Sequence, residues 1–119
     1  KEYINKLDIR VTDINTHVMN LSGGNQQKVV IAKWLAKECK VLLFDEPTRG
    51  IDVAAKAQIW KLIEDFTNSG GSVIVASNEI PELISGCNRI ITMQKSKIVK
   101  TFEQAAFNEE KISLCISTN

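Results

Sequence analysis

The sequence predicts an α/β fold with a parallel sheet, and three observations lead to this prediction. Two segments, Val41 to Phe44 and Ser72 to Ala76, are apolar along almost their whole length, which is typical of parallel strands covered on both faces. Apolar residues at helical spacing fill the segment between them. A strand, a helix and a second strand in this order form a βαβ unit, for which a right-handed crossover is expected.

The chain before the first strand is predicted to be mainly helical. Apolar residues at helical spacing indicate a turn or two of helix within residues 2–7, and a polar connector follows over residues 9–20. Ser22 is a good N-cap, and Asn25 can reach back to it as the second residue of a capping box does. Apolar residues cover most of residues 26–37, so this helix is predicted to be buried on more than one side.

The helix between the two strands has clear start and stop signals. Asp52 is a candidate N-cap, and the Asn-Ser-Gly-Gly stretch at residues 68–71 is expected to end the helix. The helix should carry one apolar stripe, which comprises Ala55, Ile59, Leu62, Ile63 and Phe66.

The last third of the chain is predicted to contain a short helix and a β-hairpin. The helix should cover residues 80–86. Two β-rich segments, residues 89–93 and 98–102, are joined by residues 94–97, an unusual hairpin turn because it lacks Gly and Asn. Residues 107–119 are expected to form a weak terminal helix or a frayed tail.

The composition is that of an ordinary soluble globular domain. The chain has 119 residues, a net charge of +1 and 44% hydrophobic residues, and its Lys and Arg residues are scattered, which argues against nucleic acid as a partner. No unbroken apolar run approaches the roughly 20 residues that span a bilayer. Cys39, Cys87 and Cys115 lack a pairing pattern and are interpreted as idle thiols, and His17 has no second ligand at metal spacing.

Ser22, Gly23 and Gly24 open the second helix and can present a hydroxyl and backbone N–H groups to an anion. The two glycines have no Cβ, so a phosphate could approach the backbone closely. Taken alone, these residues are more typical of a plain serine-capped helix with a flexible Gly-Gly entrance.

Asp45 and Glu46 follow the first strand, at the edge where α/β folds place their ligands. An aspartate there can hold Mg²⁺, which takes only one or two carboxylates and keeps most of its waters. The adjacent glutamate could orient or deprotonate an attacking water. The alternative is that Asp45 and Glu46 are a pair of solvated acids in a turn and have no catalytic role.

Together the two motifs resemble the nucleotide-binding domain of ABC (ATP-binding cassette) proteins, a P-loop NTPase fold. Residues 21–25 (Leu-Ser-Gly-Gly-Asn) resemble the signature motif, with Asn25 where most families have Gln. Residues 41–45 resemble the Walker B strand, and Glu46 resembles the catalytic glutamate that follows it. Residues 49–52 resemble the D-loop. The details are most similar to the second cassette of fused monosaccharide importers of the ribose, galactose and xylose type.

The resemblance implies ATP and Mg²⁺ as cofactors and assigns roles to individual residues. Asp45 would hold Mg²⁺, Glu46 would be the catalytic glutamate, and Asn78 stands where the family has a switch histidine. Because Asn78 cannot relay a proton, the local ATP site would be weakened. The remaining residues would contact nucleotide, and they are Ser22, Gly23, Gly24, Asn25, Gln26 and Asp52.

The resemblance also implies partners and a location. ATP would be sandwiched between the signature motif of one cassette and the Walker A loop of another. The partner cassette would be the first cassette of the same polypeptide or a second copy. Transmembrane permease subunits would bind the cassette at the inner, cytoplasmic face of the cell membrane, and a periplasmic or extracellular sugar-binding protein would act indirectly. No nucleic acid is expected.

No G-x-x-x-x-G-K-[ST] motif occurs in the 119 residues, so we expect this chain to be a fragment that neither binds ATP tightly nor hydrolyses it alone. Residues 1–37 would be the end of the helical subdomain, and residues 38–119 would be the back half of the core with its C-terminal hairpin. In the family another strand lies between residues 72–76 and residues 89–93. Its absence predicts self-association, rearranged pairing or poor stability.

Two other functions remain open from the sequence. One is an ABC-type ATPase of DNA repair or chromosome organisation, which the neutral charge and the absence of coiled-coil heptads disfavour. The other is a non-catalytic interaction module derived from a cassette.

Overall fold

Residues 2–117 are described by the computed structural model, in which the chain divides after Ala76 into two units. None of the helices in residues 2–117 has the length and apolarity needed to cross a membrane. The division into residues 1–37 and 38–119 concerns the arrangement of a whole cassette and stays a prediction.

The first unit is an α/β structure whose helices and strands alternate in the predicted order. The elements are α1 (Glu2–Lys6), η1 (Val18–Asn20), α2 (Gly23–Leu35), β1 (Val41–Asp45), α3 (Val53–Asn68) and β2 (Ser72–Ala76). Strands β1 and β2 pair in parallel, with Val41 opposite Ser72 and Asp45 opposite Ala76. The parallel sheet and the βαβ order are therefore confirmed.

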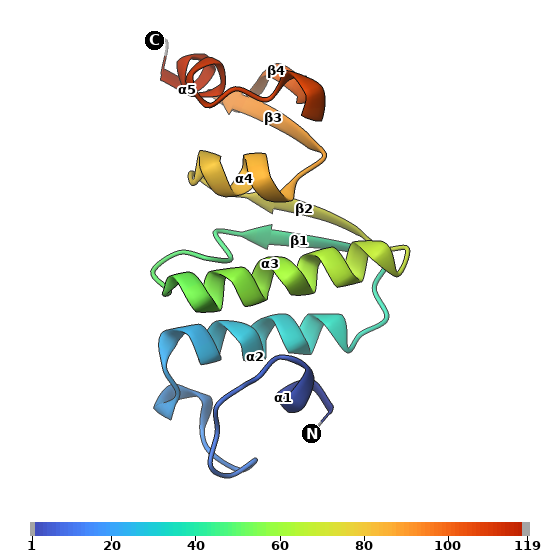
Figure 1. Ribbon diagram of the computed structural model, residues 1–119, viewed down its shortest axis with the longest axis vertical. Helices are drawn as coiled ribbons and strands as arrows, with labels where there is room; N and C mark the ends of the chain where they lie inside the picture. Colours follow the sequence, from blue (N-terminus) through green and yellow to red (C-terminus); the bar gives the residue numbers. More distant parts are fainter. Residues whose placement is uncertain (1, 118–119) are drawn as a thin grey trace. The chain divides into compact units, whose positions relative to one another are not determined.

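Helix α3 lies between α2 and the two-stranded sheet (Figure 1). Asp52 accepts a hydrogen bond from the N–H of Ala55 at 3.0 Å and so caps the helix as predicted. The helix ends before Gly70, which has a φ of +97° that favours glycine. The core of the unit comprises Leu7, Ile9, Ile31, Ala32, Ile59, Leu62 and Ile63. The predicted stripe of α3 thus faces the core, with Phe66 only partly buried.

The burial predicted for both faces of the sheet is wrong on one face, whereas α2 packs both against α3 and against the segment that contains Leu7 and Ile9. Leu43 is 73% exposed and Ile74 is 59% exposed, because α3 covers only the opposite face of the sheet. On α2, Val30 and Trp34 are also exposed. The continuous apolar pattern of the strands indicates that they could be covered on both faces, whereas in this unit α3 covers only one face of the sheet.

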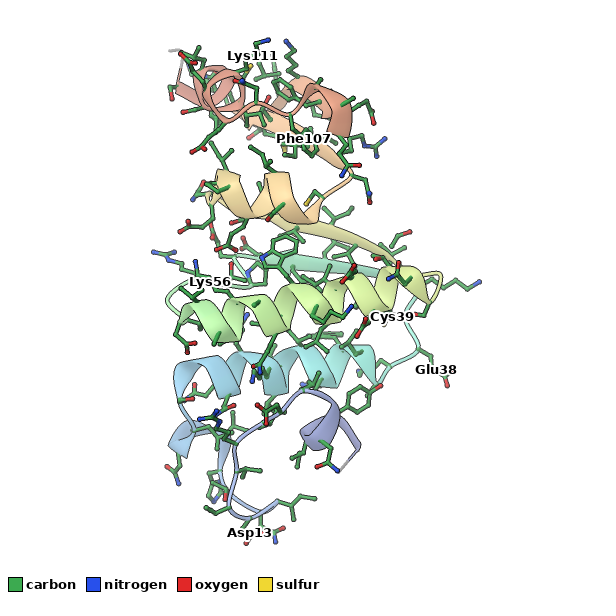
Figure 2. The ribbon with its side chains drawn as sticks, in the orientation of Figure 1. Asp13, Glu38, Cys39, Lys56, Phe107 and Lys111 are labelled. Carbon is green, nitrogen blue, oxygen red and sulfur yellow. The ribbon has the colours of Figure 1, made fainter. Side chains whose placement is uncertain are left out.

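The loop between α2 and β1 makes a sharp change of direction, and Glu38 and Cys39 lie in it (Figure 2). Glu38 has a positive φ of 50°. Cys39, Cys87 and Cys115 are all free thiols, as predicted.

The second unit combines an antiparallel hairpin with helices. Its elements are α4 (Ile80–Gly86), β3 (Arg89–Gln94), β4 (Lys97–Glu103), η2 (Gln104–Ala106) and α5 (Glu109–Ser117). The predicted short helix and hairpin are confirmed. The terminal segment forms α5 within residues 107–117, while residues 118–119 lie outside the described part of the chain. Phe107 packs against the core of Ile90, Phe102 and Ile112 (Figure 2).

The hairpin turn shows how the chain manages without Gly or Asn. Lys95 and Ser96 have φ angles of 48° and 62°, the left-handed pair that a two-residue hairpin turn of type I′ requires. Both residues carry a Cβ and therefore adopt this conformation at a cost that glycine would avoid.

Self-association stays a prediction, and the exposed face of the sheet provides a test. Within residues 2–117, β2 pairs only with β1 and β3 pairs only with β4, so strand edges are open. Sedimentation velocity of the 119-residue chain should show concentration-dependent association. Leu43→Lys places a charge on the exposed face and should weaken it. A chain that stays monomeric and melts cooperatively would contradict this expectation.

Candidate functional site

The serine-glycine loop begins α2 as the sequence predicts, but its side chains are used differently. Ser22 occupies the N-cap position with φ −60° and ψ 154°, and its side chain makes no capping hydrogen bond. Instead, Nδ2 of Asn25 donates to Oγ of Ser22 at 3.1 Å. The predicted reach of Asn25 back to the N-cap is therefore present, through the side chain of Ser22 rather than its backbone. The first-turn amides of a helix have no intrahelical acceptor.

Asn25 also fixes the loop to the connector that precedes it. The N–H of Arg10 donates to Oδ1 of Asn25 at 3.3 Å, and Nδ2 of Asn25 donates to the backbone O of Arg10 at 3.5 Å. Nε2 of Gln26 donates to the carbonyl of Leu21 at 2.8 Å and to that of Met19 at 3.4 Å. The amide of Gln26 is thus turned back onto its own loop.

Asp52 and the start of α3 lie beside this loop. A Cβ built on Gly24 would lie 3.0 Å from Cβ of Ala55 and 3.9 Å from Oδ2 of Asp52. The pKa of Asp52 lies below its usual value, chiefly because the N–H of Ala55 donates to the carboxylate, with a smaller contribution from the nearby charge of Lys28. Asp52 is therefore an anion at neutral pH.

A polar cavity of about 230 Å³ is formed where the loop, the connector and α3 meet. It brings together four of the predicted site residues, Ser22, Gly24, Asn25 and Asp52. Sequence reasoning missed the other polar residues that line it, which are Asp8, Arg10, Lys28 and Gln58. No local motif marks these four, and only the packing of α2 on α3 brings them to the cavity.

The acidic pair lies at a different place, where β1 ends. Asp45 is the last residue of β1 and is exposed, and Glu46 follows with a positive φ of 48°. The N–H of Glu46 donates to the carbonyl of Ala76 at 2.8 Å, which ties the turn to the end of β2. Neither acid lines the cavity. Asn78 follows β2 by two residues and belongs to the second unit.

Asp45 offers one exposed carboxylate, which suits a magnesium ion better than a zinc ion. Within residues 2–117 no three His, Cys, Asp or Glu side chains gather as a metal cluster, and His17 is exposed. Mg²⁺ needs no such cluster, because one or two carboxylates with substrate phosphates and water hold it. An exposed carboxylate at the end of a parallel strand fits this requirement.

Gly24→Ala should destabilise the first unit more than Gly23→Ala. A Cβ at Gly24 meets Ala55 at 3.0 Å, whereas a Cβ at Gly23 meets nothing within 4 Å. Overpacking costs about 1–3 kcal/mol, which outweighs the gain of up to about 1 kcal/mol in helix propensity. Urea unfolding followed by the fluorescence of Trp34 and Trp60 would measure both variants. Equal midpoints for the two variants would disprove the tight contact with α3.

Comparison with known proteins points to one family. A family model described as "ABC transporter" matches residues 1–49. The chain is 50% identical over 107 residues to the ribose import ATP-binding protein of Hahella chejuensis, covering 90% of this chain and 21% of that protein. It is 46% identical over 115 residues to the xylose import ATP-binding protein of Thermoanaerobacter pseudethanolicus, covering 97% of this chain and 23% of that protein. The chain thus spans less than a quarter of the length of these relatives.

Two solved structures share the fold. One is an ATP-binding cassette in a dimeric, post-hydrolysis state with ADP and Pi, at 27% identity and a TM-score of 0.76, covering 89% of this chain and 46% of that chain. The other is the ADP conformation of an ATP-binding cassette of an ABC transporter. It has 18% identity and a TM-score of 0.74, covering 94% of this chain and 42% of that chain.

Proposed function

The chain belongs to the ABC family of ATP-binding cassettes, and from this premise we propose that it forms the second half of an ATPase domain that energises sugar import. Its relatives are named as ribose and xylose import ATP-binding proteins. This segment does not specify which sugar is imported, because the selectivity for the sugar would reside in the permease and the sugar-binding protein.

One observation carries the proposal: the serine-glycine loop and the acidic pair occupy different places in the first unit. Ser22, Gly24 and Asn25 share a cavity with Asp52, whereas Asp45 and Glu46 lie at the end of β1 outside it. A single segment can therefore serve two nucleotide sites. Its loop completes a site whose Walker A loop is on a partner cassette, and its acids serve the local site.

At the partner's site, the loop acts by presenting hydrogen-bond donors to phosphate. The hydroxyl of Ser22 and the first-turn amides of α2 are available there, and the helix dipole adds to their attraction for an anion. Gly23 has open space where a Cβ would stand, so phosphate could approach its backbone. Asn25 and Gln26 hold the loop in shape through their contacts with Arg10 and Leu21.

At the local site, Asp45 would hold Mg²⁺, and the ion would neutralise charge on the ATP phosphates when bound. Glu46 would orient the attacking water or accept its proton. Asn78 stands at the position of the switch histidine and offers an amide that cannot relay a proton. This substitution supports a weakened local site and a stronger role for the signature loop.

The partners follow from the same proposal. A second cassette, either fused to this one or in a second copy, would supply the Walker A loop opposite Ser22. Permease subunits would hold the cassettes at the cytoplasmic face of the membrane, and a sugar-binding protein would deliver substrate on the other side.

A chimera tests the proposal directly. In the Hahella chejuensis protein, the segment matched over 107 residues would be replaced by this chain, to which it is 50% identical. The chimera should hydrolyse ATP within about tenfold of the parent protein, a change of about 1.4 kcal/mol in the barrier. The 119-residue chain alone should show no hydrolysis, since it has no Walker A motif. A chimera that folds and assembles but does not hydrolyse ATP would refute the proposal.

A further inference from the structure

Lys28 lies in the interior of the first unit although its side chain carries an ammonium group. Only 4% of the residue is exposed, and lysine is almost never buried to this extent without a partner. Its Nζ donates a hydrogen bond to the backbone carbonyl of Asp8 at 3.1 Å. The buried cation therefore connects α2 to the turn that follows α1.

Asp8 forms this turn in a left-handed conformation, with a φ of 46°. The N–H of Asp8 donates to the carbonyl of Asn5 at 3.2 Å, and the N–H of Ile9 donates to that of Ile4 at 2.9 Å. This pair of bonds is the Schellman motif that ends many helices, with aspartate in the place that glycine usually takes. The motif fixes the direction of the Asp8 carbonyl to which Lys28 donates.

The same turn is also held by α3. Nε2 of Gln58 donates to Oδ2 of Asp8 at 3.4 Å. Lys28 of α2 and Gln58 of α3 thus both contact the turn after α1. These two residues and Asp8 line the same cavity as Ser22 and Asp52.

Lys28 stands one helical turn after Gly24, so the two residues share a face of α2. On this face Gly24 lies against Ala55, and Lys28 lines the same cavity as Asp52. We propose that Lys28 is a positioning residue that fixes the first turn of α2, and with it the Ser22 loop, relative to Asp52 at the start of α3. The inference rests on the proposed function, because it concerns how the loop is presented to a partner's nucleotide.

The first measurement uses the active chimera and separates positioning from nucleotide binding. Lys28→Met is expected to lower kcat by about tenfold or more, because a displacement of about 1 Å at a catalytic contact can cost up to a hundredfold. KM for ATP should stay within about twofold, because the partner cassette holds most of the nucleotide. Lys28→Arg keeps a buried cation with hydrogen-bond donors and should recover most of the lost kcat.

The matched control is Lys33→Met, which makes the same substitution at an exposed lysine of the same helix. It should leave both kcat and KM unchanged. A second measurement uses NMR on the 119-residue chain. The carboxyl carbon of Asp52 should titrate at higher pH in Lys28→Met than in the unchanged chain, because the charge that helps lower its pKa has been removed.

Unchanged kcat in a folded Lys28→Met chimera would overturn the inference, as would an Asp52 titration identical to that of the unchanged chain. If Lys28→Met does not fold, Gln58→Ala removes the contact of α3 with the same turn at a partly exposed position. It should lower kcat with KM preserved, and no change in kcat would equally overturn the inference. Ser22→Arg separates the two proposals, because its failure to reduce activity would refute the proposed function itself.

Discussion

Ser22→Arg in the chimera should reduce ATP hydrolysis by a factor of about a hundred or more, the range seen when a preorganised donor to the transition state is removed. Ser22 is exposed and lines the cavity with Gly24 and Asn25. An arginine there occupies the space that a phosphate would need and removes the hydroxyl. The fold should persist, because the side chain of Ser22 makes no capping hydrogen bond and the one bond it accepts, from Asn25, is exposed.

Glu46→Gln is the substitution with which the loss of activity in Ser22→Arg should be compared. Glu46 would serve the local site, which we propose is weakened by the asparagine at position 78, so Glu46→Gln should leave much of the activity. Steady-state ATPase assays on both variants in the same chimera would measure the difference. Equal losses from the two substitutions would contradict the division of labour between the loop and the acidic pair.

Asn20→Arg is the matched control for the added charge. Asn20 is exposed on the short helix η1, two residues before Ser22, and does not line the cavity. It should retain nearly full activity. A loss equal to that of Ser22→Arg would mean that a positive charge anywhere near the loop is harmful, and the specific role of Ser22 would fail.

The elements of the fold could be predicted because their signals are local. The stripe of α3, the cap by Asp52 and the stop at Gly70 depend on residues a few positions apart, and the structure contains all three. Burial could not be predicted in the same way. Leu43 lies in a continuous apolar run and is nonetheless 73% exposed, because burial depends on which elements pack against the strand.

In the candidate site, too, the features with a local signal could be predicted and those that depend on tertiary packing could not. The serine-glycine loop and the acids were visible as motifs, but Lys28 resembled an ordinary polar break in an apolar helix. Its burial depends on the turn at Asp8, which has aspartate in the place where glycine would mark such a turn in the sequence. Gln58 of α3, 50 residues away along the chain, contacts the same turn. Likewise, the sequence could not show that Gln26 donates to its own loop rather than facing outward.

Ile59→Ala should produce the largest loss of stability in the first unit. Ile59 is 0% exposed and packs at the centre of the core between α2 and the sheet. Removing a buried isoleucine side chain to Cβ costs about 2–5 kcal/mol, since the lost burial is accompanied by a cavity that the surroundings fill only in part. For a unit of this size, native stability is itself about 4–11 kcal/mol, so the substitution would remove a large share of it.

Both tryptophans of the chain, Trp34 and Trp60, lie in the first unit, so urea unfolding followed by their fluorescence reports on this core. Ile59→Val removes one methyl group and should cost only about 0.5–1.5 kcal/mol. Val53→Ala, at an 82% exposed position of the same helix, should change the midpoint little. If Ile59→Ala and Val53→Ala had similar midpoints, α3 would not be packed between α2 and the sheet, and the scaffold that joins Ser22 to Asp52 would lose its basis.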